Sequence, residues 1–160
     1  MDLTYKWIAL AHRQYQLYLN RQLAAYGLSG SQYLFLIHIC REPGLTQDRL
    51  PVLVNLNKSN VTRSLAQLER LGYIRRECHQ RDRRTAAVFP TPAALAVYPR
   101  IMAIIADWDA SATVRLSIEE KMTLERLLKK VVAATREQDA EEAAGSRAGQ
   151  AQAGAGEAPA

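Results

Sequence analysis

Apolar residues recur along most of the chain at spacings of three and four, which mark one face of an α-helix. Between residues 3 and 26 this spacing predicts a first amphipathic helix, which Gly27 would end. A second helix, residues 33–40, is apolar nearly all round, so we expect it at the centre of the core. Ser29 and Gln32 have the spacing of a capping box at its start. The apolar face of the first helix consists of Leu3, Trp7, Ala11, Tyr15, Tyr18, Leu19 and Tyr26.

Two shorter helical segments follow, joined by a tight turn. Thr46 can cap the first, which reaches about Val54, and Pro51 would distort one of its turns by removing a backbone hydrogen bond. Asn57 can cap the second, residues 58–71. Two short helices joined in this way predict a helix-turn-helix. The inward face of the second would be formed by Val61, Leu65, Leu68 and Leu71.

A β-hairpin and a long helix come next. The strand-like runs 73–78 and 85–89 flank a polar loop, and such a hairpin after a helix-turn-helix would be the wing of a winged helix. Thr91 and Pro92 then supply an N-cap and a proline at the first helical position. The helix they open carries apolar residues at near-heptad spacing, namely Leu95, Tyr98, Met102, Ile105, Trp108 and Ala112.

A last helix begins at a capping box formed by Ser117 and Glu120. The long terminal helices carry more apolar surface than a small winged-helix core can cover, so we expect them to pack against a second copy of the chain. The fold class predicted is therefore mainly α with a small β-hairpin wing, a winged helix-turn-helix with N- and C-terminal dimerisation helices. The apolar face of the last helix is Leu124, Leu127, Leu128, Val131 and Val132.

Length and composition narrow the class of protein. With 160 residues, 48% of them hydrophobic, the chain has room for one globular domain. Residues 140–160 are rich in Ala, Gly and Gln and hold no large apolar residue, so we expect a disordered tail there. Runs such as 101–106 are too short to span a bilayer, and the start MDLTYKW lacks the pattern of a secretory signal, so we expect a cytoplasmic protein. Two cysteines, Cys40 and Cys78, make neither a disulfide framework nor a metal site, and we expect no cofactor.

Positive charge is concentrated in one part of the chain. Residues 58–84 hold eight basic and three acidic side chains, a net charge of +5 that equals the net charge of the whole chain. Seven of the eight are arginines, whose planar guanidinium groups suit phosphates and guanine edges. Such a window is typical of a nucleic-acid contact, although a solvated arginine-rich face would look the same.

Four motifs, in this order and spacing, resemble the MarR (multiple antibiotic resistance regulator) family. They are Thr46-Gln47-x-x-Leu50, Asn57-Lys58-Ser59-x-Val61-Thr62-Arg63, Leu68-Glu69-x-x-Gly72-Tyr73-Ile74-x-Arg76 and Asp82-Arg83-Arg84. The resemblance implies a homodimeric winged helix-turn-helix transcription factor that binds double-stranded DNA at a pseudo-palindromic operator. It also implies a repressor that a small aromatic effector releases. The domain would be residues 1–139, with a DNA-binding lobe at 28–91 and dimerisation helices at 1–27 and 92–139.

Helical spacing and the resemblance together select the DNA-binding residues. Ser59, Asn60, Arg63 and Gln67 lie opposite the inward face of their helix, which would enter the major groove. Arg63 could bind guanine and Asn60 adenine, while Lys58, Ser59 and Thr62 suit phosphates. The alternative for Arg63 is a surface ion pair with Glu69 or Asp48.

The resemblance also assigns roles in the wing. It implies that Arg84 inserts into the minor groove and that Asp82 holds its guanidinium in place. Arg81 and Arg83 would contact the DNA backbone.

An effector site is harder to derive. By resemblance it would lie between the dimer helices and the DNA-binding lobe, although packing in the core or the dimer is the commoner role of such aromatic residues and of a histidine such as His38. Cys78 at the base of the wing raises the alternative of a redox-sensing regulator. The candidate effector-binding residues are His12, Tyr15, Gln16, Tyr33, His38 and Trp108.

Other classes of function fit the sequence less well. The three histidines are scattered, and the chain has no Gly-rich phosphate loop and no nucleophile elbow, so we expect no enzyme. A winged-helix module that binds RNA or a protein is the other alternative. RNA readers commonly expose stacking aromatic residues, and neither the helix at 58–71 nor the wing loop contains one, which favours duplex DNA.

Overall fold

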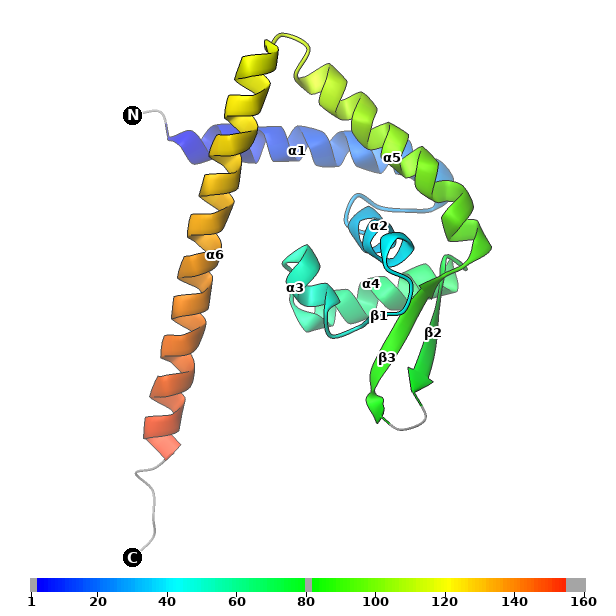
Figure 1. The fold of residues 1–160 in the computed structure, drawn as a ribbon, viewed down its shortest axis with the longest axis vertical. Helices are drawn as coiled ribbons and strands as arrows, with labels where there is room; N and C mark the ends of the chain where they lie inside the picture. The colour runs from blue at the N-terminus through cyan, green and yellow to red at the C-terminus, as the bar shows by residue number, and fades with distance from the viewer. Residues whose placement is uncertain (1–2, 80–81, 155–160) are drawn as a thin grey trace, which may run out of the picture. The chain divides into compact units, whose positions relative to one another are not determined.

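The computed structural model describes the backbone of residues 3–79 and 82–154 and the side chains of residues 3–77 and 86–138. The chain divides into two compact units, residues 1–112 and 113–160 (Figure 1). The second unit contains α6 (Ile118–Gly154). The first contains, in chain order, α1 (Thr4–Leu23), the 3₁₀ turn η1 (Ala24–Tyr26), α2 (Tyr33–Arg41), β1 (Leu45–Thr46), α3 (Leu50–Val54), α4 (Lys58–Arg70), β2 (Ile74–His79), β3 (Asp82–Pro90) and α5 (Pro92–Ala112).

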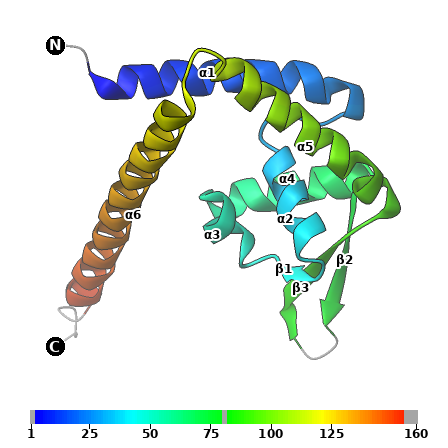
Figure 2. The ribbon, with the colours of Figure 1, turned by 45° about the horizontal axis from the view of Figure 1, so that its top comes forward.

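The predicted winged helix-turn-helix is confirmed. Helix α4 begins where expected, because the Asn57 side chain accepts a hydrogen bond of 2.9 Å from the Asn60 backbone N–H. It ends before Gly72, whose φ of 76° lies in the left-handed region that glycine adopts readily. The strands β2 and β3 pair antiparallel and extend beyond the neighbouring helices α2 and α4 (Figures 1 and 2).

The start of α3 was predicted wrongly. Thr46 does not cap a helix but lies in β1, where it pairs with Ala87 of β3 to form the sheet order β1-β3-β2. Helix α3 begins only at Leu50, after a turn. Pro51 therefore stands in the first helical turn, where its missing N–H has no hydrogen bond to lose, and the predicted distortion has no cause.

The core of the first unit lies beneath α4 and around α2. The fully buried side chains come from α1, α2, α3, α4, both wing strands and α5, so one cluster joins the helix-turn-helix to the flanking helices. In α5 the buried residues are Ala94, Val97 and Ile101, and not the predicted Leu95, which is exposed. The central helix α2 is buried on most sides, as predicted.

Two tyrosines link the end of α1 to the junction between α4 and the wing. The Tyr73 hydroxyl donates a hydrogen bond of 2.8 Å to the backbone carbonyl of Tyr26. On the other side of the same junction, the Thr91 hydroxyl donates to the carbonyl of Gly72 at 2.6 Å. Thr91 also caps α5 as predicted, since its side-chain oxygen accepts from the Ala94 N–H at 3.4 Å.

The N-terminal half of α1 leaves apolar side chains exposed. Trp7 is 60% exposed, although it was predicted to lie on the buried face of the helix. Only the C-terminal half is anchored in the core, through Leu19 and Leu23. The other exposed apolar side chains of the N-terminal half are Leu3, Tyr5, Ile8 and Leu10.

Helix α6 starts at the predicted capping box. The Glu120 N–H donates to the Ser117 hydroxyl at 3.2 Å, and the Ser117 N–H donates to the Glu120 carboxylate at 2.8 Å. The helix continues to Gly154, whereas the composition of residues 140–160 predicted a disordered tail. Alanine is the strongest helix former and is frequent in residues 140–154, which accounts for the difference. The apolar side chains of α6 are exposed, among them Met122, Leu124, Leu127, Leu128, Val131 and Val132.

Candidate nucleic-acid interface

Helix α4 has one buried and one exposed face, as its sequence predicts. Val61, Leu65 and Leu68 are at most 1% exposed and fix the helix on the core. The opposite face is open to solvent over the first two turns and half-buried at Gln67. Its exposed members are the predicted DNA-binding residues Lys58, Ser59, Asn60, Thr62 and Arg63.

The two acids that the sequence offered as partners of Arg63, Glu69 and Asp48, both contact other residues. Glu69 forms an ion pair with Arg76, and Asp48 lies 3.9 Å from the Lys58 ammonium. Among the described side chains, neither acid is paired with Arg63. Its five N–H donors therefore face solvent from the exposed side of α4, in the arrangement that base recognition requires.

The predicted phosphate ligands differ in what they can donate. The Ser59 hydroxyl donates to the Asn57 side chain at 2.9 Å, and the Thr62 hydroxyl donates to the Lys58 carbonyl at 2.9 Å. A hydroxyl has one proton, so neither can donate to a phosphate without giving up that bond. The Lys58 side chain is 82% exposed and has three ammonium protons, which makes it the strongest phosphate ligand of the three.

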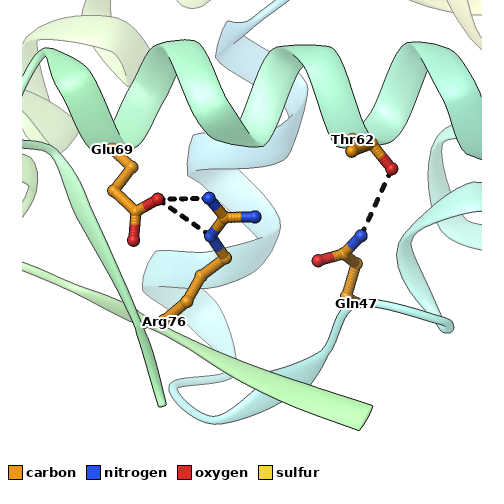
Figure 3. A network of polar contacts seen from close by, with 4 residues as sticks. All are labelled: Gln47, Thr62, Glu69 and Arg76. Carbon is orange, nitrogen blue, oxygen red and sulfur yellow. Dashed lines mark hydrogen bonds and ion pairs between the residues drawn. The ribbon is translucent and has the colours of Figure 1, made fainter. Parts of the chain in front are cut away.

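Two polar contacts hold α4 at its opposite ends (Figure 3). Near its start, the Gln47 side-chain amide donates to the Thr62 hydroxyl at 3.3 Å. Near its end, the Arg76 guanidinium on β2 donates to the Glu69 carboxylate, through Nε at 2.9 Å and through a second nitrogen. Sequence reasoning missed Gln47 and Arg76, because both contacts join residues of different elements.

The Glu69–Arg76 contact makes the stability of the chain depend on pH. Its hydrogen bonds lower the pKa of Glu69 below the ordinary value of 4.5. A lowered pKa in the folded state means that this stabilisation is complete above pH 4.5 and is lost as the pH falls through the folded-state value. We expect Glu69→Gln to remove this part of the acid transition, measured as the melting temperature between about pH 3 and pH 6, a range that brackets the ordinary glutamate pKa. An unchanged pH profile in the variant would contradict the expectation.

The wing carries two arginines whose surroundings the structure describes, Arg75 and Arg76, and others that it does not. Arg75 of β2 stacks on the ring of Phe89, 4.7 Å from the ring centre, and forms an ion pair with Glu77. Arg81 lies outside the described residues. The backbone of Asp82, Arg83 and Arg84 belongs to β3, but their side chains lie outside the described part of the chain, as does that of Cys78.

Three of the six predicted effector residues are brought together in the first unit. The hydroxyl groups of Tyr15 and Tyr33 are 2.9 Å apart, and the ring of Trp108 lies 5.5 Å from that of Tyr15. Tyr18, not among the six, completes the cluster with its ring 5.2 Å from Trp108. Tyr18 follows Tyr15 by three residues, a helical spacing that could have identified it.

Burial keeps the two central phenols protonated. Desolvation raises the pKa of Tyr15 and, more strongly, that of Tyr33. One of the two hydroxyl protons lies between the oxygens, and the other is available to an acceptor. The cluster formed by Tyr15, Tyr18, Tyr33 and Trp108, called here the aromatic cluster, can therefore donate a hydrogen bond from an apolar site.

The other three predicted effector residues are placed less centrally. Gln16 is half-buried one residue from Tyr15, His38 is half-buried on α2, and His12 is exposed on α1. Desolvation raises the pKa of the half-buried Cys40 thiol, which favours its protonated, less reactive form.

Over the part of the chain that the structure describes, no group of three or more His, Cys, Asp or Glu side chains could hold a metal ion. Within the same described residues, every helix is too short or too polar to cross a membrane.

Comparison with known proteins supports this architecture. Residues 26–85 match a model of the MarR family. The chain is 30% identical to the uncharacterized HTH-type transcriptional regulator YybA of Bacillus subtilis, over 65% of this chain and 69% of that protein.

Solved structures share the fold at lower identity. The crystal structure of the transcriptional regulator SlyA is 23% identical, with a TM-score of 0.82 over 86% of this chain and 96% of that one. A putative MarR family regulator from Listeria monocytogenes, solved in complex with 26mer DNA, is also 23% identical, with a TM-score of 0.77 over 83% of this chain and 89% of that one. From its motifs, its fold and these relatives, the chain belongs to the MarR family, whose members are transcriptional regulators and not enzymes.

Proposed function

We propose that the chain is a sequence-specific regulator that binds double-stranded DNA in the cytoplasm as a homodimer. The exposed polar face of α4 is the observation that carries the proposal, because Asn60 and Arg63 project from a helix that is fixed on the core by its other face. In this arrangement α4 enters the major groove and the wing reaches the neighbouring minor groove. The DNA-bound Listeria relative with the same fold supports it.

A second copy of the chain accounts for the exposed apolar residues. Trp7 on α1 and Leu128 on α6 are 60% and 40% exposed, and each has apolar neighbours on the same helix. Soluble monomers rarely leave such surfaces open. Two copies would place two α4 helices about 34–36 Å apart, which matches half-sites one DNA turn apart in a pseudo-palindromic operator.

Competition in a gel shift tests the proposal against its main alternative. The chain should retain a labelled duplex enriched from a random-sequence library, and unlabelled duplex of that sequence should displace it far better than RNA of the same sequence. Equal displacement by RNA would instead favour the RNA-binding module. Peroxide treatment in the same assay tests the redox alternative through Cys78, and we expect no change in affinity.

The proposed effector is a small aromatic acid bound at the aromatic cluster, and its release of the DNA would make the chain a repressor. The available phenol proton of Tyr15 or Tyr33 can bind a carboxylate or hydroxyl group, while Trp108 offers a ring face. Gln16, His12 and His38 would contribute at its margin. Packing without any ligand is the simpler role, and titration separates the two.

Salicylate serves as the probe for this prediction. In a Trp7→Phe variant only Trp108 fluoresces, and we expect saturable quenching as salicylate is added. Tyr33→Phe should weaken salicylate binding by about three- to tenfold, the value of one hydrogen bond. The matched control is Trp108→Phe, in which the remaining Trp7 should respond only in proportion to concentration. A linear response from Trp108 would assign the cluster to packing alone.

A further inference from the structure

The junction between α4 and the wing is short and turns at a glycine. Three residues separate Arg70 from Ile74, and Gly72 among them has a φ of 76° with no atom within 4 Å of where a Cβ would stand. Backbone hydrogen bonds close the turn, from the Gly72 N–H to the Glu69 carbonyl at 2.9 Å and from the Tyr73 N–H to the Leu68 carbonyl at 3.0 Å. These bonds fix the turn itself but leave the direction of the strand to contacts further away.

The Glu69–Arg76 ion pair spans this junction from outside. Glu69 lies in the last turn of α4 and Arg76 is the third residue of β2, so the contact (Figure 3) joins the two elements on either side of the turn. Arg76 pairs with Val88 in the register of β2 and β3, which makes the guanidinium part of the rigid hairpin. The pair is partly shielded, with side-chain exposures of 29% and 37%.

Charge gives a second reason to assign the pair a role. An acid on a helix that faces phosphates weakens DNA binding unless a cation neutralises it. Glu69 nevertheless occupies the last turn of α4, and its carboxylate is bound by Arg76. Glu77 on the same strand pairs instead with Arg75, a residue of β2 itself, so this second ion pair does not join the wing to α4.

We propose that the Glu69–Arg76 pair is a positioning contact that sets the angle between α4 and the wing, so that both can enter their grooves at once. The proposal rests on the DNA-binding function proposed above. Gln47 supports the other end of α4 through Thr62, which leaves the helix with a polar contact to a neighbouring element near each terminus. Neither Glu69 nor Arg76 needs to touch DNA for this role.

The test compares two variants with the same change in charge. Glu69→Gln and Glu77→Gln each remove one negative charge near the wing, and the lost repulsion alone would tighten DNA binding equally in both. We expect Glu77→Gln to bind the enriched duplex unchanged or about twofold tighter. We expect Glu69→Gln to bind it about three- to fivefold more weakly, at a temperature where circular dichroism shows all proteins fully folded.

A double-mutant cycle with the wing arginine separates positioning from other causes. Arg84→Ala should weaken binding less in the Glu69→Gln background than in the wild-type background, because a wing that is already misplaced has less contact to lose. In the Glu77→Gln background the loss should equal that of the wild type. Equal affinities of the two glutamine variants, or equal effects of Arg84→Ala in every background, would overturn the positioning role and leave the proposed function intact. If the wild-type chain enriches no duplex at all, the proposed function fails first and the inference with it.

Discussion

We expect the affinity of the chain for operator DNA to fall by about 10³–10⁵ between about 50 and 200 mM salt, for six to ten phosphate contacts. The reason is the release of condensed cations from DNA as basic side chains neutralise phosphates. The basic window at residues 58–84 supplies these side chains, and Lys58 among them is 82% exposed. Fluorescence anisotropy over a salt series measures the slope.

Lys58 should account for about one unit of that slope. Lys58→Ala should weaken binding to all sequences by a similar factor and reduce the salt slope by about one. The matched control is Lys130→Ala, which removes the same charge from α6 in the other unit of the chain. A salt slope near zero for the wild type would mean that basic side chains do not bind DNA phosphates. It would remove the main electrostatic support for the proposed function.

Arg63→Ala is expected to cost about 1–3 kcal/mol of binding free energy, concentrated at one base pair of the operator. The loss would come from a bidentate hydrogen bond to guanine O6 and N7. The Arg63 side chain can make this contact because it is exposed and is paired with neither Glu69 nor Asp48. Affinities for a set of operators with single substitutions reveal it as a position at which the variant no longer discriminates.

Arg70→Ala is the control for this experiment. Arg70 is exposed in the last turn of the same helix, so its removal changes the charge equally without reaching the N-terminal half of α4. Its loss should be small and the same for every operator. If Arg63→Ala also weakens binding to every operator equally, Arg63 contacts the DNA backbone. Another residue then recognises the base that was assigned to Arg63.

The helix-turn-helix and the wing were predictable because their signals are local. Asn57 caps α4 through a side chain three residues from its partner, and the apolar spacing of Val61, Leu65 and Leu68 identifies the buried face without knowledge of the rest of the fold. The same holds for the capping box at Ser117. Signals of this kind depend only on residues one or two turns apart.

The misses concern contacts between distant segments. Strand β1 has two residues, too few for any periodicity, and it exists only because Val88 and Ala87 of β3 lie opposite. Thr46 was therefore interpreted by its strong local preference for helix caps.

In the candidate site, too, the features set by local spacing were predictable and the contacts between distant segments were not. The exposed face of α4 follows from helical spacing, whereas the partner of Glu69 does not. Arg63 and Glu69 stand six residues apart on one helix and so point in different directions, while the turn at Gly72 brings Arg76 under the end of α4. The sequence identified Tyr15, Tyr33 and Trp108 of the aromatic cluster as candidates by their residue type. It could not show that they are in contact, because the contacts depend on how α1, α2 and α5 pack together.

The bond between Tyr73 and the carbonyl of Tyr26 connects η1, the turn that follows α1, to the junction in front of the wing. A hydrogen bond of this kind contributes about 0.5–1.5 kcal/mol to stability, so it favours the present placement of the two segments without fixing it alone. In the proposed DNA-bound dimer, this hydrogen bond would act beside the shared core as a polar connection between the helix that meets the second subunit and the elements that meet DNA.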